Sequence, residues 1–215
     1  VNKKPLIYYP ISAAIKSQVC DKIFVSTDSP VIARYGKKYG AEVPFLRKKK
    51  YSGDYITTET TLKNALKSYE IYYKTKFDIC VFLTCTNIFR NYKNIKIAVE
   101  RLKKNKNIDT VLTATQLYRH FWHYKNGKLT KVLPWMKRYH SRQKAPILLR
   151  EEAGITCVTR AKFWRKGFRI GNKVSIIKNN FPFSDIDIHT KDDIKIANSA
   201  IKIILKNKKF KNYLK

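Results

Sequence analysis

Acidic residues are scarce in this sequence, and that shortage is its most unusual property. Fifteen Asp and Glu stand against 46 Lys and Arg among 215 residues, which gives a formal net charge of +31. A charge of this sign favours polyanionic partners such as nucleic acid, anionic lipid or a nucleotide. The lysines are nevertheless scattered, and Ile, Asn and Tyr are plentiful. An AT-rich coding bias produces the same pattern, so the charge alone does not identify a nucleic-acid-binding protein.

Cysteine, glycine and proline are also rare, at four, seven and seven residues. The cysteines form no C-x-x-C pair and have no histidine at metal-ligand spacing, which is typical of a reduced, cytoplasmic protein. No apolar run approaches the ~18 residues of a membrane span, and there is no signal peptide, so we expect no membrane association. The first residue is Val rather than Met, which indicates a fragment of a longer chain.

Several common motifs are missing as well. The sequence has no G-x-x-x-x-G-K-[ST], no G-x-G-x-x-G and no G-x-S-x-G, so a P-loop, a dinucleotide fingerprint and a nucleophile elbow are not indicated. It also has no RRM aromatics and no helix-turn-helix pattern, so we expect no specific nucleic-acid partner.

Apolar runs of strand length alternate with segments of helical periodicity. Helices are predicted over 6–16, 30–40, 58–73, 95–102 and 194–204. Strands are predicted over 22–26, 42–46, 78–84, 110–114, 155–159 and 173–178. This alternation predicts one α/β domain over 1–215, with a mostly parallel sheet flanked by helices.

The stretch from about 117 to 150 breaks the alternation. Asn126-Gly127 signals a tight hairpin, and the surrounding residues are rich in aromatics and arginine, which are enriched in interface cores. We expect an inserted arm that builds a homodimer. The alternative is that these aromatics fold back on the sheet as ordinary core.

Asp185 and Asp187 are the sharpest local signal for chemistry. Two carboxylates two residues apart in an extended segment point the same way, and Mg²⁺ is commonly held by one or two carboxylates plus substrate phosphates. The alternative is a helix-cap role for Asp187 and a solvent-facing Asp185. Thr57 and Thr58, which follow Asp54, fit either phosphate binding or the start of a helix.

Taken together, these segments resemble the acylneuraminate cytidylyltransferase family. The resemblance is carried by KPLI at 4–7, IFVSTD at 23–28, YGAEVPFLR at 39–47, Asp54 with Thr57 and Thr58, LTCTNIFR at 83–90, Arg142-Gln143 with Pro146, Arg150 and Gly154, and DID at 185–187. It spans essentially the whole chain. It implies a Rossmann-like, GT-A-like nucleotidyltransferase fold and transfer of CMP from CTP to a 2-keto-3-deoxy nonulosonic acid, with release of pyrophosphate.

The resemblance also implies roles for individual residues. Asp185 and Asp187 would be catalytic and would hold Mg²⁺, with Mn²⁺ as an alternative. Arg47, Asp54, Thr57 and Thr58 would bind the nucleotide. Arg142, Gln143, Thr84 and Arg150 would bind the sugar acid, with the arm reaching across the dimer.

Two departures from the family pattern matter. The family's glycine-, lysine- and arginine-bearing phosphate loop would precede Val1, so either the sequence is a fragment, which the missing Met favours and which would be inactive alone, or the chain itself is inactive. Thr84 and Cys85 replace a Gln-Pro pair whose Gln helps to bind the sugar, which leaves the sugar's identity open. The eight-carbon 3-deoxy-octulosonate is an alternative acceptor, and a basic nucleic-acid-binding protein is the alternative outside this enzyme class.

Overall fold

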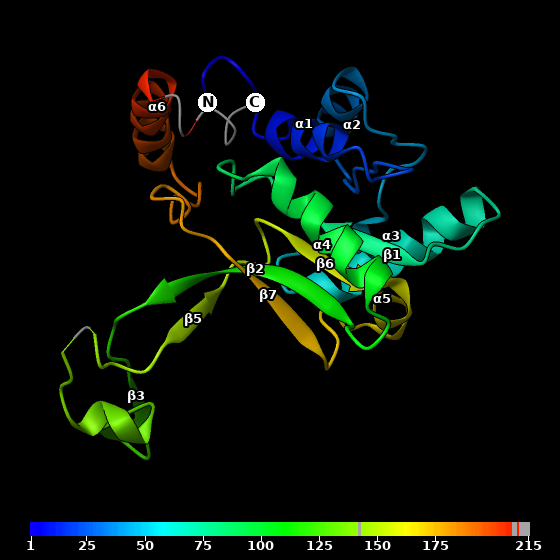
Figure 1. Ribbon diagram of the computed structural model, residues 1–215. Helices are drawn as coiled ribbons and strands as arrows, with labels where there is room; N and C mark the ends of the chain where they lie inside the picture. Colours follow the sequence, from blue (N-terminus) through cyan, green and yellow to red (C-terminus); the bar gives the residue numbers. More distant parts are fainter. Residues whose placement is uncertain (142, 208–209, 211–215) are drawn as a thin grey trace.

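The structure is a computed structural model that describes residues 1–141, 143–207 and 210 (Figure 1). The α-helices are α1 (Tyr8–Ser17), α2 (Pro30–Lys38), α3 (Thr58–Tyr72), α4 (Tyr92–Lys104), α5 (Ala161–Lys166) and α6 (Lys191–Lys206). The strands are β1 (Ile79–Phe82), β2 (Thr110–Leu117), β3 (Trp122–Lys125), β4 (Lys128–Lys131), β5 (Leu148–Glu151), β6 (Cys157–Arg160) and β7 (Val174–Lys178). Short 3-10 helices cover Lys49–Tyr51 and Pro134–Lys137.

The central sheet has five strands and is mixed. Strand β6 lies between β1 and β2 and runs antiparallel to both, while β7 runs parallel to β2. Strands β1, β2 and β7 therefore point the same way, as predicted for a mostly parallel sheet. The hydrogen-bonded pairs are nevertheless mainly antiparallel, because β5 and β6 both run against β2. The sequence pattern did not indicate these two reversed strands.

Helices cover both faces of the sheet, which confirms the predicted α/β class. On one face, Ala98, Val99 and Leu102 of α4 pack on Val111 and Val158 of β2 and β6. On the other face, residues of α3 and α5 pack around Cys80 of β1. Successive residues of β1 thus face opposite helical layers, as a strand that is covered on both sides requires.

The two strands predicted near the N-terminus are reduced to a single parallel bridge between Phe24 and Glu42. The Val25 amide donates to the Glu42 carbonyl, and the Glu42 amide donates to the Ile23 carbonyl. The next amide in such a ladder would come from Pro44, which has no N–H to donate. The Tyr69 hydroxyl of α3 donates to the Val25 carbonyl instead, at 3.0 Å.

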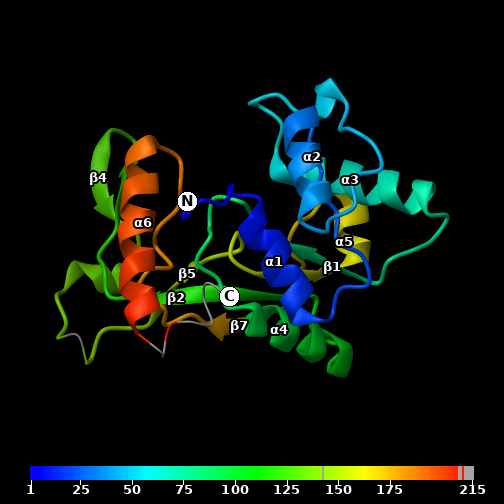
Figure 2. The same cartoon turned by 90° about the horizontal axis from the view of Figure 1, so that it is seen from above.

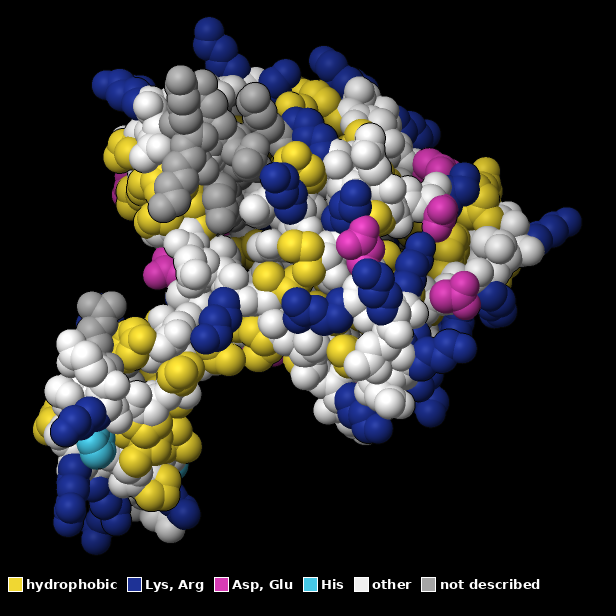
Figure 3. Space-filling model, in the orientation of Figure 1, with side chains coloured by type: hydrophobic (Ala, Val, Ile, Leu, Met, Phe, Trp, Pro, Cys, Tyr) yellow, Lys and Arg dark blue, Asp and Glu magenta, His cyan; other side chains and the backbone are white. Residues whose placement is uncertain are grey.

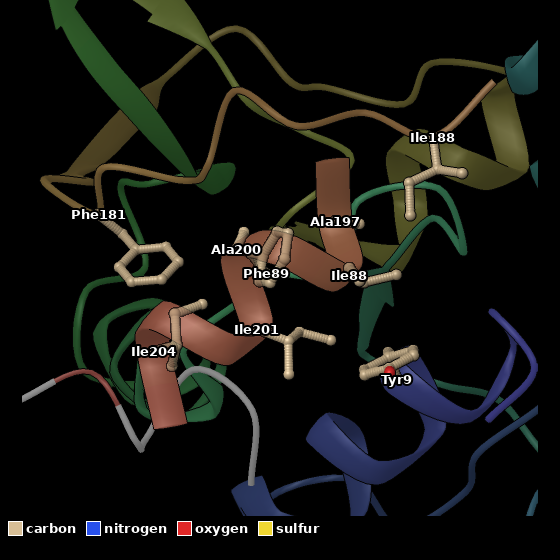
Figure 4. Packing of buried hydrophobic residues seen from close by; sticks show 9 residues of the cluster. All are labelled: Tyr9, Ile88, Phe89, Phe181, Ile188, Ala197, Ala200, Ile201 and Ile204. Carbon is tan, nitrogen blue, oxygen red and sulfur yellow. The ribbon is translucent and has the colours of Figure 1, made fainter. Parts of the chain in front are cut away.

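Helix α6 closes the core beside the segments that follow β1 and β7. Its buried face, Ala197, Ala200, Ile201 and Ile204, packs against Ile88, Phe89, Phe181, Ile188 and Tyr9 (Figure 4). Seen from above, α1 lies between α6 and α2 (Figure 2). None of the helices in the described ranges combines the length and the apolar character needed to cross a bilayer.

The predicted arm projects from the body as a separate lobe (Figures 1 and 3). It contains the hairpin of β3 and β4, in which Asn126 and Gly127 both have positive φ, as the turn requires. Met136 is fully buried inside the arm. Among the described residues, the hydrophobic clusters of the body include no arm aromatic, so these aromatics do not fold back on the sheet.

Candidate active site

A cavity of about 400 Å³ opens where β1 and β7 end. Three segments line it: Asn87 after β1, residues 150–155 from the end of β5 into the loop before β6, and Ser184, Asp185 and Asp187 after β7. Arg169 adds a second basic side chain to the wall. Ligands in α/β sheets bind at the carboxyl ends of the parallel strands, and this cavity occupies that position.

Residues 150–155 form a wall of the cavity because the strand pairing along β2 is interrupted between β5 and β6. Ala114 pairs with Glu151 and Leu112 with Cys157, so Thr113 faces the whole segment 152–156. Thr113 accepts from the Glu152 amide at 2.8 Å and donates its own amide to the Thr156 carbonyl at 3.0 Å. Both ends of the loop are thereby fixed, and its residues project into the cavity.

The predicted carboxylate pair lies on the outer wall. Asp185 and Asp187 both line the cavity, while Ile188 is buried and Ile186 packs against the same core cluster. The alternation of carboxylate and isoleucine therefore places both acids on the cavity side, as the spacing predicted. Asp187 pairs with His189 at 2.9 Å.

Arg150 and Glu152 form the charged centre of the cavity. Arg150 Nη2 lies 2.9 Å from Glu152 Oε1 and also contacts Asp185 Oδ1. Burial lowers the pKa of the Arg150 guanidinium, but its bonds to Glu152 and Asp185 outweigh that effect, and the net pKa is raised. Glu152 is buried and also accepts hydrogen bonds from the Thr115 hydroxyl and from the side-chain amide of Asn179, each at 2.7 Å. Sequence reasoning missed Glu152, because only the loop along β2 brings it here.

Thr84 lies behind the wall and does not line the cavity. Its hydroxyl donates to Asn87 Oδ1 at 2.7 Å and lies 3.1 Å from the Gly154 carbonyl, so Asn87 is the residue presented to a ligand. Buried Arg90 donates to the carbonyls of Thr84 and Asn87. Burial lowers the pKa of Arg90 to about 9. Sequence reasoning also missed Asn87. The signal that could have found it is its position shortly after β1 and two residues before the buried Phe89.

The four predicted nucleotide-binding residues gather near the start of α3. Thr57 caps that helix by accepting from the Thr60 amide at 3.2 Å, and Thr58 is its first residue. Arg47 binds Ser52 at 3.0 Å and pairs with Asp28 at 3.5 Å, while Asp54 is exposed on the intervening loop. None of the four lines the cavity.

Arg169 links the start of α3 to the cavity. It pairs with Glu59 in the first turn of α3 at 3.9 Å and with Glu151 of β5 at 3.2 Å, and it also lines the cavity wall. The predicted nucleotide group is therefore next to the cavity without being part of its wall. Gln143 is exposed on the arm, and Arg142 lies outside the described residues.

The residues fit a divalent cation with two ligands from the chain. Asp185 and Asp187 are partly exposed carboxylates on one wall, and carboxylate oxygen is the ligand that Mg²⁺ prefers. Within the described ranges, no three His, Cys, Asp or Glu side chains gather as a metal site. A metal here would need phosphate oxygens and water for its remaining ligands, as Mg²⁺ in nucleotide sites does.

The architecture and the cavity position define the chain as an α/β protein of the nucleotidyltransferase fold. A solved CMP:2-keto-3-deoxy-manno-octonic acid synthetase complexed with CTP shares this fold, with a TM-score of 0.64 at 10% sequence identity over 93% of this chain and 88% of that one. A family model described as cytidylyltransferase matches residues 1–178. The chain belongs to the cytidylyltransferase family, whose members are nucleotidyltransferase enzymes, and the family resemblance read from its sequence is confirmed.

Two curated relatives are similar over long or well-matched stretches. The pseudaminic acid cytidylyltransferase of Campylobacter jejuni is 27% identical over 207 residues, which cover 93% of this chain and 86% of that protein. The CMP-N,N'-diacetyllegionaminic acid synthase of Legionella pneumophila is 38% identical over 100 residues, which cover 45% and 41%.

Proposed function

We propose that this protein transfers CMP from CTP to a 2-keto-3-deoxy nonulosonic acid. The anomeric hydroxyl of the sugar acid attacks the α-phosphorus, the bond to the β-phosphate breaks, and pyrophosphate leaves. The observation that carries the proposal is that Arg150, Asp185 and Asp187 line one cavity at the carboxyl ends of β1 and β7. The names of the two relatives, which act on nonulosonic acids, support the acceptor class.

Asp185 and Asp187 would hold Mg²⁺, or Mn²⁺ in its place. When bound, the ion would neutralise charge on the triphosphate and the departing pyrophosphate. The chain's own contribution would be to carry both carboxylates on the cavity side of one extended segment and to keep them out of the core. Positioning and charge neutralisation account for most of the catalysis expected of such a transfer.

The remaining predicted residues would divide between the two substrates. Thr57 and Thr58 at the start of α3, with Arg47 and Asp54 on the preceding loop, would bind the nucleotide. The helix start favours an anion through its dipole, and Arg169 connects it to the cavity. Arg150 would bind an anionic group of the sugar acid, with Arg142 and Gln143 reaching over from the arm of a partner subunit. Thr84 would act through Asn87.

A homodimer and a cytoplasmic location belong to the same proposal. The projecting arm carries the exposed aromatics Trp122, Tyr124 and Tyr139. The four cysteines are free, which is typical of a reducing compartment.

The direct test is pyrophosphate release from CTP and Mg²⁺ with a panel of acceptors. The panel contains pseudaminic, legionaminic and N-acetylneuraminic acids, with 3-deoxy-octulosonate as the eight-carbon alternative. We expect release with at least one nine-carbon acid and less with the octulosonate. Release with the octulosonate alone would change the acceptor, and release with none, even from a chain extended at its N-terminus, would contradict the proposal.

The nucleic-acid alternative has a separate test. Oligonucleotide binding is titrated with salt, because a purely electrostatic contact weakens steeply as counterions are added. We expect binding that shows no sequence preference and is lost at physiological salt.

A further inference from the structure

Arg150 reaches two carboxylates through a single nitrogen. Its Nη2 lies 2.9 Å from Glu152 Oε1 and contacts Asp185 Oδ1 at the same time. One positive charge between two carboxylates is the arrangement in which a divalent cation would also be stable. The two partners differ in exposure: the Glu152 side chain is 5% exposed, and that of Asp185 is 61% exposed.

Glu152 is fixed from several sides. Thr115 donates to its Oε1 at 2.7 Å, and Asn179 donates to its Oε2 at 2.7 Å. Its backbone is tied to Thr113 by the bond that begins the loop along β2. A buried carboxylate with this many donors keeps its position, because moving it would break the bond from the Asn179 side-chain amide and leave the Thr115 hydroxyl only the Asn179 carbonyl, at 3.2 Å. Asp185, on the exposed segment after β7, contacts Arg150 and is 61% exposed, so its carboxylate is the less constrained of the two.

We propose that the Arg150 guanidinium neutralises Asp185 in the absence of a metal ion and so acts as a resident cation at the metal position. Glu152 is the residue that positions Arg150 there. Arg150 would give up Asp185 to an incoming divalent ion, while Glu152 would retain the guanidinium. The N–H of Arg150 released from Asp185 would then face the cavity as a donor to an anionic group of a substrate. Metal binding and anion binding are thereby coupled through one side chain. This inference rests on the metal role proposed above for Asp185.

The test measures Mn²⁺ binding to the nucleotide-free protein by the EPR signal of the free ion. Arg150→Met removes the competing charge and keeps most of the side-chain length. We expect it to bind Mn²⁺ about tenfold more tightly than the unaltered chain, which corresponds to about 1.4 kcal/mol. Arg169→Met is the matched control, because it removes an equal charge from the same cavity wall but from Glu59 and Glu151 rather than Asp185. Its effect should be several-fold smaller.

Glu152→Gln tests the positioning role. The substitution keeps the size of the side chain but leaves Arg150 with Asp185 as its carboxylate partner, so Mn²⁺ should bind more weakly. Most of that loss should vanish when Arg150→Met is combined with it, because the coupling runs through Arg150. A merely structural Glu152 would lower the melting temperature in both backgrounds and leave the two effects on Mn²⁺ binding additive.

Asp185→Asn distinguishes a failure of the metal role of Asp185 from a failure of the resident-cation role of Arg150. If it weakens Mn²⁺ binding in the unaltered chain while Arg150→Met and Arg169→Met have equal effects, the resident-cation inference is overturned and the metal role stands. If Asp185→Asn leaves Mn²⁺ binding unchanged, the metal role fails and the inference fails with it. Tighter binding in Arg150→Met that disappears in the Arg150→Met/Asp185→Asn double variant supports both.

Discussion

Asp185 and Asp187 are held outside the core by the two isoleucines with which they alternate. Ile188 is buried beside α6 and Ile186 packs on the same cluster, and their backbone amides donate to the carbonyls of Thr86 and Phe183, so the segment is positioned without the two carboxylates. The carboxylates can therefore be changed without disturbing the packing that places them. This separation makes a clean test of function possible at the level of one residue.

Asp187→Ala should lower turnover with CTP and a sugar acid by at least about a hundredfold, because preorganised charge stabilisation is worth several kcal/mol. The melting temperature should stay within about 2 °C, since the side chain is exposed and serves no core contact. Pyrophosphate release and thermal unfolding are measured on the same preparation. Normal turnover at saturating Mg²⁺ would contradict the assignment.

Gly154 carries a different constraint, because the site itself prevents a side chain there. A Cβ at this position would lie 2.8 Å from Thr84 Oγ1 and closer still to Asn87 Oδ1. Gly154→Ala should cost about 1–3 kcal/mol of unfolding free energy by overpacking. Gly53→Ala is the control, since its Cβ would meet only Ile56 Cγ1 at 3.9 Å.

Chemical denaturation compares the two variants. Adding Asn87→Ala to Gly154→Ala should restore part of the lost stability, because it removes the closest obstructing atom. Equal stability of Gly154→Ala and Gly53→Ala would show that the loop shifts freely.

The residues of the site differ in how far the sequence reveals them. The acid pair is local: two carboxylates alternate with apolar residues, and any extended backbone places them on one side. Glu152 and Asn87 depend on distant contacts, because Glu152 is held by Thr113 of β2, and Asn87 is placed by Thr84, which bonds the Gly154 carbonyl across the cavity wall. A single sequence carries no record of such pairings.

At the scale of elements, Glu70 ties α3 to α5 and to the start of β1. Arg165 of α5 donates through Nη2 to Glu70 Oε1 at 2.6 Å and through Nε to Oε2 at 3.2 Å, and the Phe77 amide donates to Oε1 at 3.1 Å. Burial alone would raise the pKa of Glu70, but the bonds from Arg165, Phe77 and Lys76 outweigh it and lower the pKa to about 2. The elements are therefore joined by an ionised carboxylate.

Acid should weaken the connection that the Glu70 carboxylate makes between α3, α5 and the start of β1. The pKa of Glu70 falls from its ordinary 4.5 to about 2 on folding, so its stabilisation is fully present above about pH 4.5 and is lost as the pH falls toward 2. The displacement corresponds to about 3 kcal/mol. Glu70→Gln should destabilise the protein at pH 7 and flatten the decline of stability between pH 4.5 and 2, measured by denaturant unfolding across that range. Parallel pH profiles for Glu70→Gln and the unaltered chain would contradict this account.

Element prediction succeeded where the signal was periodic and failed where a backbone donor was missing. The helices from Pro30 and from Thr58 begin at the predicted residues, because Ser29 and Thr57 supply the caps. The apolar runs at 22–26 and 42–46 have strand composition, yet Pro44 stops their ladder after one bridge. The antiparallel direction of β5 and β6 depends on the arm that precedes them, which composition does not encode.

At the scale of the whole molecule, the arm and the net charge act against each other. The arm presents an apolar patch on a separate lobe, while Lys and Arg are spread over the visible face (Figure 3). With a net charge of +31 per chain, two copies repel each other, so association must depend on the apolar contacts and must strengthen as salt screens the charge.

We expect a homodimer that dissociates less at 0.5 M than at 0.05 M salt, at micromolar concentration, by sedimentation velocity. Tyr124→Asp, on the arm and 73% exposed, should shift the population toward monomer, because a charge in an interface core is costly. Tyr55→Asp makes the same change at a fully exposed tyrosine outside the arm and should leave the dimer intact.

If a dimer forms, Arg142→Ala mixed with Asp187→Ala should regain part of the activity that each lacks, since a heterodimer contains one intact site when the arm serves its partner. A monomer at both salt concentrations would rule out the shared site, and a dimer without complementation would place each arm over its own subunit's cavity.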